Sequence, residues 1–153
     1  MSLVLKPDGY TDVVNDSLQQ ALLWVTTTSG SAGDWIAEYT TDTTNPAGVT
    51  GESFRTAASG NADALYGTCA VAAVAWSAAG YVPCYIRGFC TANVDSGAAV
   101  AIGDDLSVGA TAGRAIEYTG TNPDLRVIGR CLSTPSGNLA SVEVYPHPRF
   151  SSL

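Results

Sequence analysis

Short apolar runs separated by glycine fill the second half of the chain. From Gly80 to Gly137 a glycine recurs every four to nine residues. Most intervals hold a run in which apolar and β-branched residues alternate with polar ones or cluster, as in YVPCYIRGFC and RVIGRCLS. Glycine accepts the positive φ that tight turns need, and runs of this composition favour strands. The pattern predicts a series of short strands connected by hairpins.

About seven strands after residue 65 are enough for a small barrel. One run, Cys69–Ala79, is almost entirely small and apolar, so periodicity alone fits a buried strand or a buried helix. Its valines, its tryptophan and the strands that follow favour a strand. The fold class predicted is mainly β, a small antiparallel β barrel or sandwich.

The pattern before residue 65 is different. Residues 1–10 are rich in turn formers and are typical of an arm. Between Thr11 and Val25 apolar residues recur at three- and four-residue steps, and Ser17 with Gln20 fits a capping box. This favours one short helix, although the valines and the threonines that follow also fit a strand.

The next two segments are predicted as a strand and a loop. Trp35–Tyr39 alternates as a strand does, and residues 40–60 have the polar composition of a long loop or second arm. We therefore expect three parts: an arm, short helix and long loop over residues 1–65, a β-barrel domain over 66–146, and a tail over 147–153.

Composition argues against several classes of function. The net charge is −7, and Lys6 is the single lysine among seven basic residues, whereas nucleic-acid binding depends on concentrated Lys and Arg. Only 14% of residues are charged, which suggests a surface largely covered by protein, and arginine is favoured over lysine at such interfaces. We expect no nucleic-acid partner.

The N-terminal residues and the hydropathy pattern predict synthesis in the cytoplasm. MSLVLKPDGY has no apolar core of the kind a secretory signal carries, and no stretch of about 18 apolar residues occurs. We expect no membrane partner, and reduced, buried cysteines that pack as small apolar groups. These cysteines are Cys69, Cys84, Cys90 and Cys131.

Catalytic and metal-binding patterns are not apparent. The cysteines form no C-x-x-C pair, and the single histidine, His147, lies between two prolines near the C-terminus. Asp104 and Asp105 are adjacent, so on a strand they point to opposite faces, and a turn role is favoured over a catalytic or calcium-binding one. We expect no enzyme activity, no metal and no cofactor.

Two tryptophans are the candidate interface residues. Trp76 lies in an apolar run and is expected in the core. Trp24 and Trp35 flank a polar loop outside the main β region, where either could pack internally or anchor an interface, since tryptophan is enriched at interfaces.

Five segments together resemble the small decoration, or cement, proteins of tailed-bacteriophage capsids. The likeness covers roughly residues 66–146: a strand ending in R-G, a G-D-x-L turn, a T-A-G-R-A step, a V-I-G-R strand and a closing V-E-V strand. Cys131 stands where the pattern often has alanine. The segments are Val82–Gly88, Ala101–Leu106, Ala112–Ala115, Val127–Leu132 and Leu139–Val144.

The resemblance implies a virion structural protein on the outer surface of a capsid. Such a protein bridges neighbouring subunits of the major capsid protein and is commonly a homotrimer. A tail or head-fibre component that binds a receptor or glycan is the alternative that the sequence leaves open.

Overall fold

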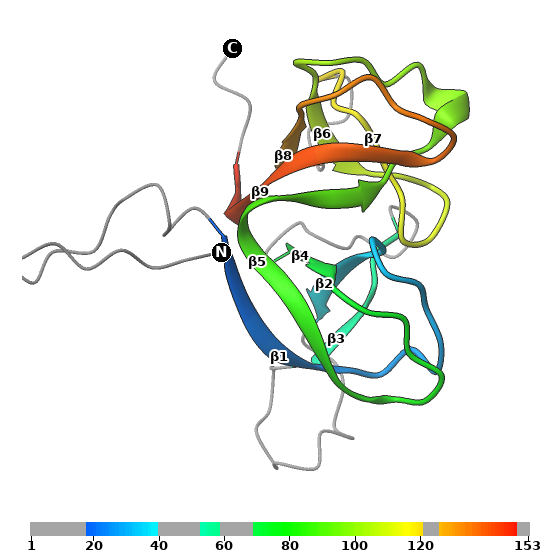
Figure 1. Ribbon diagram of the computed structural model, residues 1–153, viewed down its shortest axis with the longest axis vertical. Helices are drawn as coiled ribbons and strands as arrows, with labels where there is room; N and C mark the ends of the chain where they lie inside the picture. Colours follow the sequence, from blue (N-terminus) through cyan, green and yellow to red (C-terminus); the bar gives the residue numbers. More distant parts are fainter. Residues whose placement is uncertain (1–17, 40–52, 59–68, 121–125, 150–153) are drawn as a thin grey trace, which may run out of the picture.

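The computed structural model describes residues 18–39, 53–58, 69–120 and 126–149, and the chain is mainly β, as predicted (Figure 1). Helical structure within these ranges is limited to a 3-10 turn over Ser96–Ala98. The strands are β1 (Gln19–Val25), β2 (Trp35–Tyr39), β3 (Ser53–Thr56), β4 (Cys69–Ala72), β5 (Gly80–Asn93), β6 (Asp105–Val108), β7 (Ala115–Glu117), β8 (Val127–Cys131) and β9 (Leu139–Arg149).

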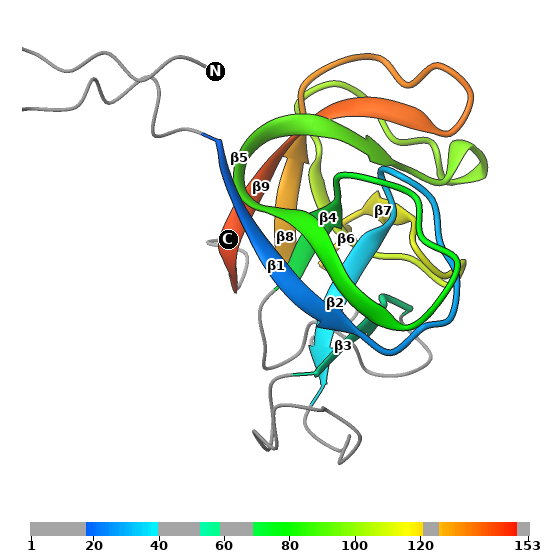
Figure 2. The same cartoon turned by 60° about the horizontal axis from the view of Figure 1, so that its bottom comes forward.

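The strand pairings close two rings that share β5. In the N-terminal ring, β5 pairs with β1 and β4, β4 with β2, and β2 with β3, which returns to β1 through the parallel pair of Val25 and Phe54. In the C-terminal ring, β5 pairs with β9, followed by β8, β6 and β7. A parallel bridge from Ala115 to Val94 closes it beside the end of β5. Figure 1 shows the N-terminal ring below the C-terminal ring, and Figure 2 shows β1 and β5 side by side.

β5 serves both rings because it changes direction at Gly88. Its pairing with β1 extends to Arg87, opposite Gln19, and its pairing with β9 begins at Gly88, opposite Val144. Gly88 has a φ of 95°, in the region that residues with a side chain rarely adopt. The glycine therefore lets one 14-residue strand contribute to both rings.

β2 and β4 are buried on both faces and form the wall between the two halves. Ile36 and Ala70 pack inside the N-terminal ring. Trp35 and Val71 pack on the opposite face, in a cluster shared with the C-terminal ring. A strand covered on both faces has a continuous apolar sequence, which explains the run CAVA in β4. From the C-terminal ring the shared cluster includes Leu106, Val108, Ile128, Val142 and Val144.

The prediction of a short helix within Thr11–Val25 is wrong for Gln19–Val25, because these residues form β1. Residues 11–17 lie outside the described residues. Leu23 and Val25 pack in the core of the N-terminal ring, as alternate residues of a strand do. Leu22, directly before Leu23, points to the other face and is apolar although it is exposed. Apolar residues on both faces of one strand produced the three- and four-residue steps that resembled a helix.

Three expected segments also differ in extent. The strand expected over Cys69–Ala79 ends at Ala72, because the chain then leaves the sheet and Trp76 pairs with Gly30. Within the expected loop over residues 40–60, Ser53–Thr56 forms β3, held to the Thr26–Thr27 segment by hydrogen bonds.

The third is the expected tail, since β9 continues to Arg149 and includes its first residues. The expected boundary between residues 65 and 66 lies outside the described ranges. Strands from the two sides of it pair, β2 with β4.

Gly129→Ala is expected to destabilise the protein, because a Cβ at this position would overlap the Glu143 carbonyl oxygen and lie 3.1 Å from Cη2 of Trp35. Overpacking of this kind costs about 1–3 kcal/mol. Gly80→Ala is the control, since the nearest atom to its Cβ is 3.9 Å away. Urea unfolding followed by circular dichroism measures both variants, and equal midpoints would contradict this packing.

Candidate functional site

The two candidate tryptophans occupy different environments. Trp35 is fully buried in the shared core, and its Nε1–H donates to the Asn93 carbonyl oxygen at 3.0 Å. The possibility that Trp35 anchors an interface is therefore corrected: its ring joins the two halves of the molecule and cannot reach a partner. Trp76, expected in the core, is partly buried, and its Nε1–H donates to the Thr27 carbonyl oxygen at 2.8 Å.

Trp24 lies at the surface of the N-terminal ring. It stands opposite Tyr81 in the β1–β5 register, and the two rings meet edge to face with centroids 5.2 Å apart and an interplanar angle of 69°. Trp24 is half-buried, and its Nε1 is a buried atom without a hydrogen-bond partner in the described part of the chain. The aromatic pair contributes about 0.5–1.5 kcal/mol beyond the apolar area that it covers.

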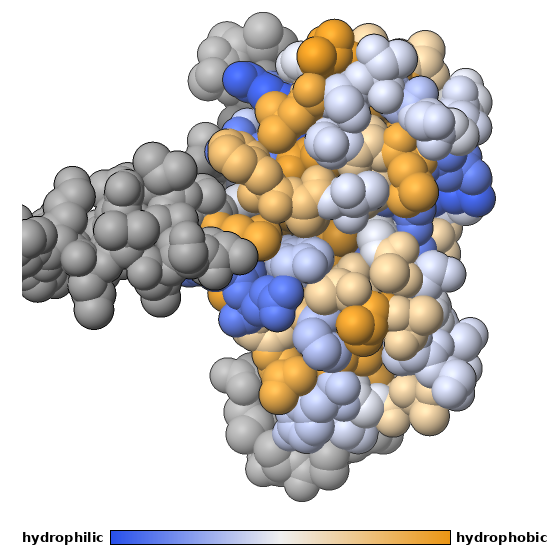
Figure 3. All heavy atoms as spheres, in the orientation of Figure 1, coloured by the Kyte–Doolittle hydropathy of each residue, from blue (hydrophilic) through white to orange (hydrophobic). Residues whose placement is uncertain are grey.

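Trp24 belongs to an apolar surface that we call the β1–β5 face, made of Leu22, Trp24, Tyr81 and Pro83. Leu22 stands opposite Pro83, one alternation from the Trp24–Tyr81 pair, so the four side chains lie on one side of the two strands. Leu22 is 67% exposed and Tyr81 57% exposed. Figure 3 shows hydrophobic and weakly polar residues over much of the visible surface, with strongly hydrophilic residues confined to small areas.

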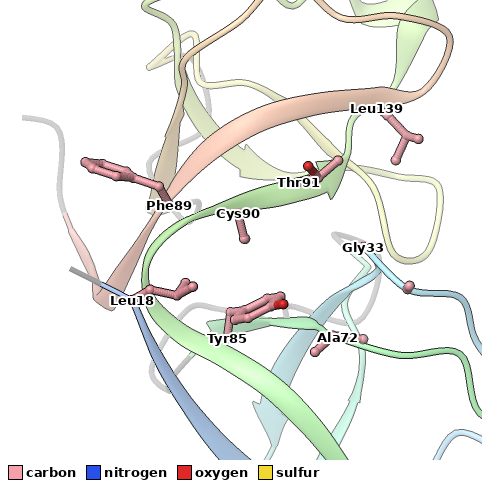
Figure 4. A pocket seen from close by; sticks show the side chains of 10 residues that line it. Leu18, Gly33, Ala72, Tyr85, Phe89, Cys90, Thr91 and Leu139 are labelled. Carbon is pink, nitrogen blue, oxygen red and sulfur yellow. The ribbon is translucent and has the colours of Figure 1, made fainter. Parts of the chain in front are cut away.

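A groove of about 340 Å³ lies beside this face, where β5 passes from one ring to the other. Figure 4 shows the Tyr85 ring and the Cys90 side chain directed into it, whereas Phe89 points away from it. Its lining is mainly apolar and comes from both rings. The residues are Leu18, Ala32, Gly33, Ala72, Ala73, Tyr85, Phe89, Cys90, Thr91 and Leu139.

A second, polar pocket of about 500 Å³ shares Ala32 and Leu139 with the groove. Its acidic residue, Asp34, accepts from Nδ2 of Asn93 at 2.7 Å and from the backbone N–H of Ser31 at 2.8 Å. The two carboxylate oxygens therefore link the Ser31 backbone to the Asn93 side chain, which belongs to a different segment. The other polar lining residues are Thr111, Arg114, Ser136 and Asn138.

Another exposed apolar area lies on the C-terminal ring, and we call it the Ile102–Leu132 area. Ile102 is 63% exposed and Leu132 36% exposed. Gly103, with a φ of 91°, donates its backbone N–H to the Cys131 carbonyl oxygen at 2.8 Å, which holds the turn after Ile102 against the end of β8. This area comes from the turn before β6 and the segment after β8, and shares no residue with the β1–β5 face.

Of the adjacent aspartates, Asp104 has the expected turn role, whereas Asp105 belongs to a strand. Asp104 accepts the Ala101 backbone N–H at 2.7 Å within the turn before β6. Asp105 begins β6, where it forms a partly exposed ion pair with Arg130 at 3.4 Å. His147 lies in β9, and its side chain is outside the described part of the molecule.

The four cysteines are free thiols, as expected, and three of them are buried. Burial raises the pKa of Cys84 to about 12 and the pKa of Cys90 to about 12. Both thiols are therefore protonated near neutral pH, and a protonated thiol is a poor nucleophile and a poor metal ligand.

Within the described residues, no group of three or more histidine, cysteine, aspartate or glutamate side chains is arranged to hold a metal ion. Among the same residues, no helix is long and apolar enough to cross a membrane.

Comparison with known proteins finds no matching family model and no matching curated sequence. The site is therefore described from its own residues. Sequence reasoning identified Trp24 but missed Leu22 and Tyr81, because their exposure depends on the pairing of β1 with β5. The alternation of Tyr81, Pro83 and Tyr85 was the available signal.

Exchanging each tryptophan for phenylalanine separates the two environments. Trp35→Phe removes the donor to the Asn93 carbonyl and leaves a small cavity in the shared core, which we expect to cost about 1–3 kcal/mol. Trp24→Phe removes an N–H that has no partner and is expected to change stability by less than about 1 kcal/mol. Urea midpoints measure both, and a larger loss for Trp24→Phe would refute the assignment.

The raised thiol pKa values predict a loss of stability at high pH. Thiols of the unfolded chain lose their protons from about pH 9.0, whereas those of Cys84 and Cys90 keep theirs until about pH 12 in the folded protein. Raising the pH above 9 therefore favours the unfolded chain, by up to about 1.4 kcal/mol per pH unit for each thiol. Urea unfolding between about pH 8 and pH 10.5 should show the decline, and a Cys84→Ala/Cys90→Ala variant should show a shallower one. A variant with the same slope as the wild type would contradict the prediction.

Proposed function

We propose that this protein is a virion structural protein that decorates a phage capsid and stabilises it by bridging subunits of the major capsid protein. The observation that carries the proposal is the pair of exposed apolar surfaces, the β1–β5 face and the Ile102–Leu132 area, on the two halves of one molecule. A bridging protein needs two separate contact surfaces held at a fixed spacing. Complete burial of an exposed leucine or isoleucine side chain contributes about 1.5–3 kcal/mol of favourable free energy.

The shared core supports this role. Trp35, Val71 and Ile128 pack in one cluster that spans both rings, so the two surfaces belong to one body. When one decorating molecule contacts two shell subunits, separating them requires breaking both contacts. Binding to the assembled shell, and not to its separated subunits, stabilises the shell by mass action.

The resemblance to cement proteins supports the proposal further. Its R-G step is Arg87–Gly88, where β5 changes direction, and its G-D-x-L step is the turn that enters β6. Its V-I-G-R step lies in β8, where Gly129 packs beneath Trp35. The motif glycines thus occupy positions that shape the body. The proposal includes the homotrimer and the outer capsid surface that the resemblance implies.

A receptor- or glycan-binding component of the tail or a head fibre is the second candidate. The polar pocket favours it, because Asn138, Arg114 and Thr111 line a concave surface that adjoins the groove containing Tyr85. Aromatic and polar side chains together are the usual lining of a sugar site. Binding to a glycan array that is lost in Asn138→Ala and Arg114→Ala, with no binding to capsids, would favour this candidate over decoration.

Capsid binding tests the decoration proposal. Capsids assembled from the phage's major capsid protein alone are incubated with the purified protein, and bound copies and the temperature of capsid disruption are measured. Wild-type protein is expected to bind and to raise that temperature. Leu22→Lys and Ile102→Lys should each weaken binding by about tenfold or more, because a charge replaces a buried apolar contact.

The matched control is Thr134→Lys, which adds the same charge at an exposed residue of neither surface. It should bind as the wild type does. Failure of the wild-type protein to bind, or equal binding by all four proteins, would reject the proposal.

A further inference from the structure

β1 has one open edge. From Gln19 to Trp24 its backbone pairs with β5 on one side, and β3 reaches it only at Val25. Each ring is closed by pairings or bridges between the described strands. Within the described residues, this stretch of β1 is a six-residue strand edge without a paired neighbour.

The open edge lacks the features that usually prevent strand addition. Proteins protect edges with charged side chains, proline, bulges or very short strands. β1 is seven residues long, QQALLWV, without charge or proline, and its irregularity is confined to Gln19 and Gln20 at one end. Leu22, at its centre, is 67% exposed beside the open edge.

We propose that this edge pairs with β1 of a second copy of the chain, antiparallel across a two-fold axis at Leu22. An antiparallel edge is self-complementary, because the same donors and acceptors meet in reverse order. This register sets Leu22 against Leu22 and Gln20 against Trp24 of the other copy. β1 has no charged side chain, so this pairing brings no like charges together, although the chain as a whole carries a net charge of −7.

The two-fold contact itself does not depend on the proposed function. Its role on a capsid does rest on that proposal. A two-fold contact joins exactly equivalent surfaces, so it cannot itself build the homotrimer that we propose. It joins one decorating unit to the next, and the Ile102–Leu132 area of each molecule stays outside it. On a shell, lateral pairing would make each bound copy favour the binding of its neighbour.

Self-association of the purified protein tests the contact without capsids. In sedimentation equilibrium, the wild-type mass should rise with concentration to at least twice that of the smallest species. Leu22→Lys should raise the dissociation constant of this step at least tenfold, because it sets two ammonium groups opposite each other. Thr134→Lys is the control, since Thr134 is exposed, lies outside β1 and belongs to neither contact surface. It should associate as the wild type does.

A cysteine at the axis gives a second readout. Directly opposite residues of antiparallel strands have Cα atoms about 4.5–5.5 Å apart, within the range that disulfides span. Leu22→Cys should therefore form a covalent dimer under mild oxidation, and Thr134→Cys should not. Thermal melting checks that both variants fold.

The sedimentation and cross-linking results together decide whether β1 pairs with β1 of a second copy. Loss of association in Leu22→Lys alone, with a covalent dimer of Leu22→Cys, supports two-fold pairing. A wild-type mass independent of concentration, unchanged association in Leu22→Lys, or no Leu22→Cys dimer overturns it. Capsid binding is measured separately, so decoration can fail while pairing holds, and the reverse.

Discussion

Burial of β2 and β4 on both faces is the constraint on which the rest of the structure depends. One face fills the N-terminal ring, and the other meets the C-terminal ring around Trp35, whose indole also donates to the Asn93 carbonyl. Asp34 adds a second link through Asn93. Because the same strands complete two cores, neither half can shift without opening the other. The spacing between surfaces on the two halves is consequently fixed by packing.

This architecture accounts for the form of the candidate site. A chain with few charged residues folds into closed rings, which leave few strand edges and place apolar residues on the outside where β1 and β5 are uncovered. The polar groups with clear roles, Asp34 and Asp104 among them, hold turns and loops together. Protein contact, made by shape and apolar burial, is the function these features support best.

The sequence predicted the mainly β fold and most strands after Gly80, because glycine-bounded alternation is a local signal. It failed at β1, where apolar residues on both faces imitated a helical period. It left the environment of Trp35 undecided, because the burial of Trp35 depends on a distant ring. The alternation of Tyr81 and Pro83 indicates a shared face, but the exposure of that face and of Leu22 depends on which strands pair and which faces remain uncovered. Local chemistry is predictable from sequence here, whereas the surface that remains after packing is not.

The proposed decoration of a phage capsid can be examined by electron cryomicroscopy of the intact particle. We expect density for this body on the outer surface of the capsid, in contact with at least two subunits of the major capsid protein, with the β1–β5 face or the Ile102–Leu132 area at each contact. Density for the body at the tail or a fibre, or a capsid surface without it, would contradict the account.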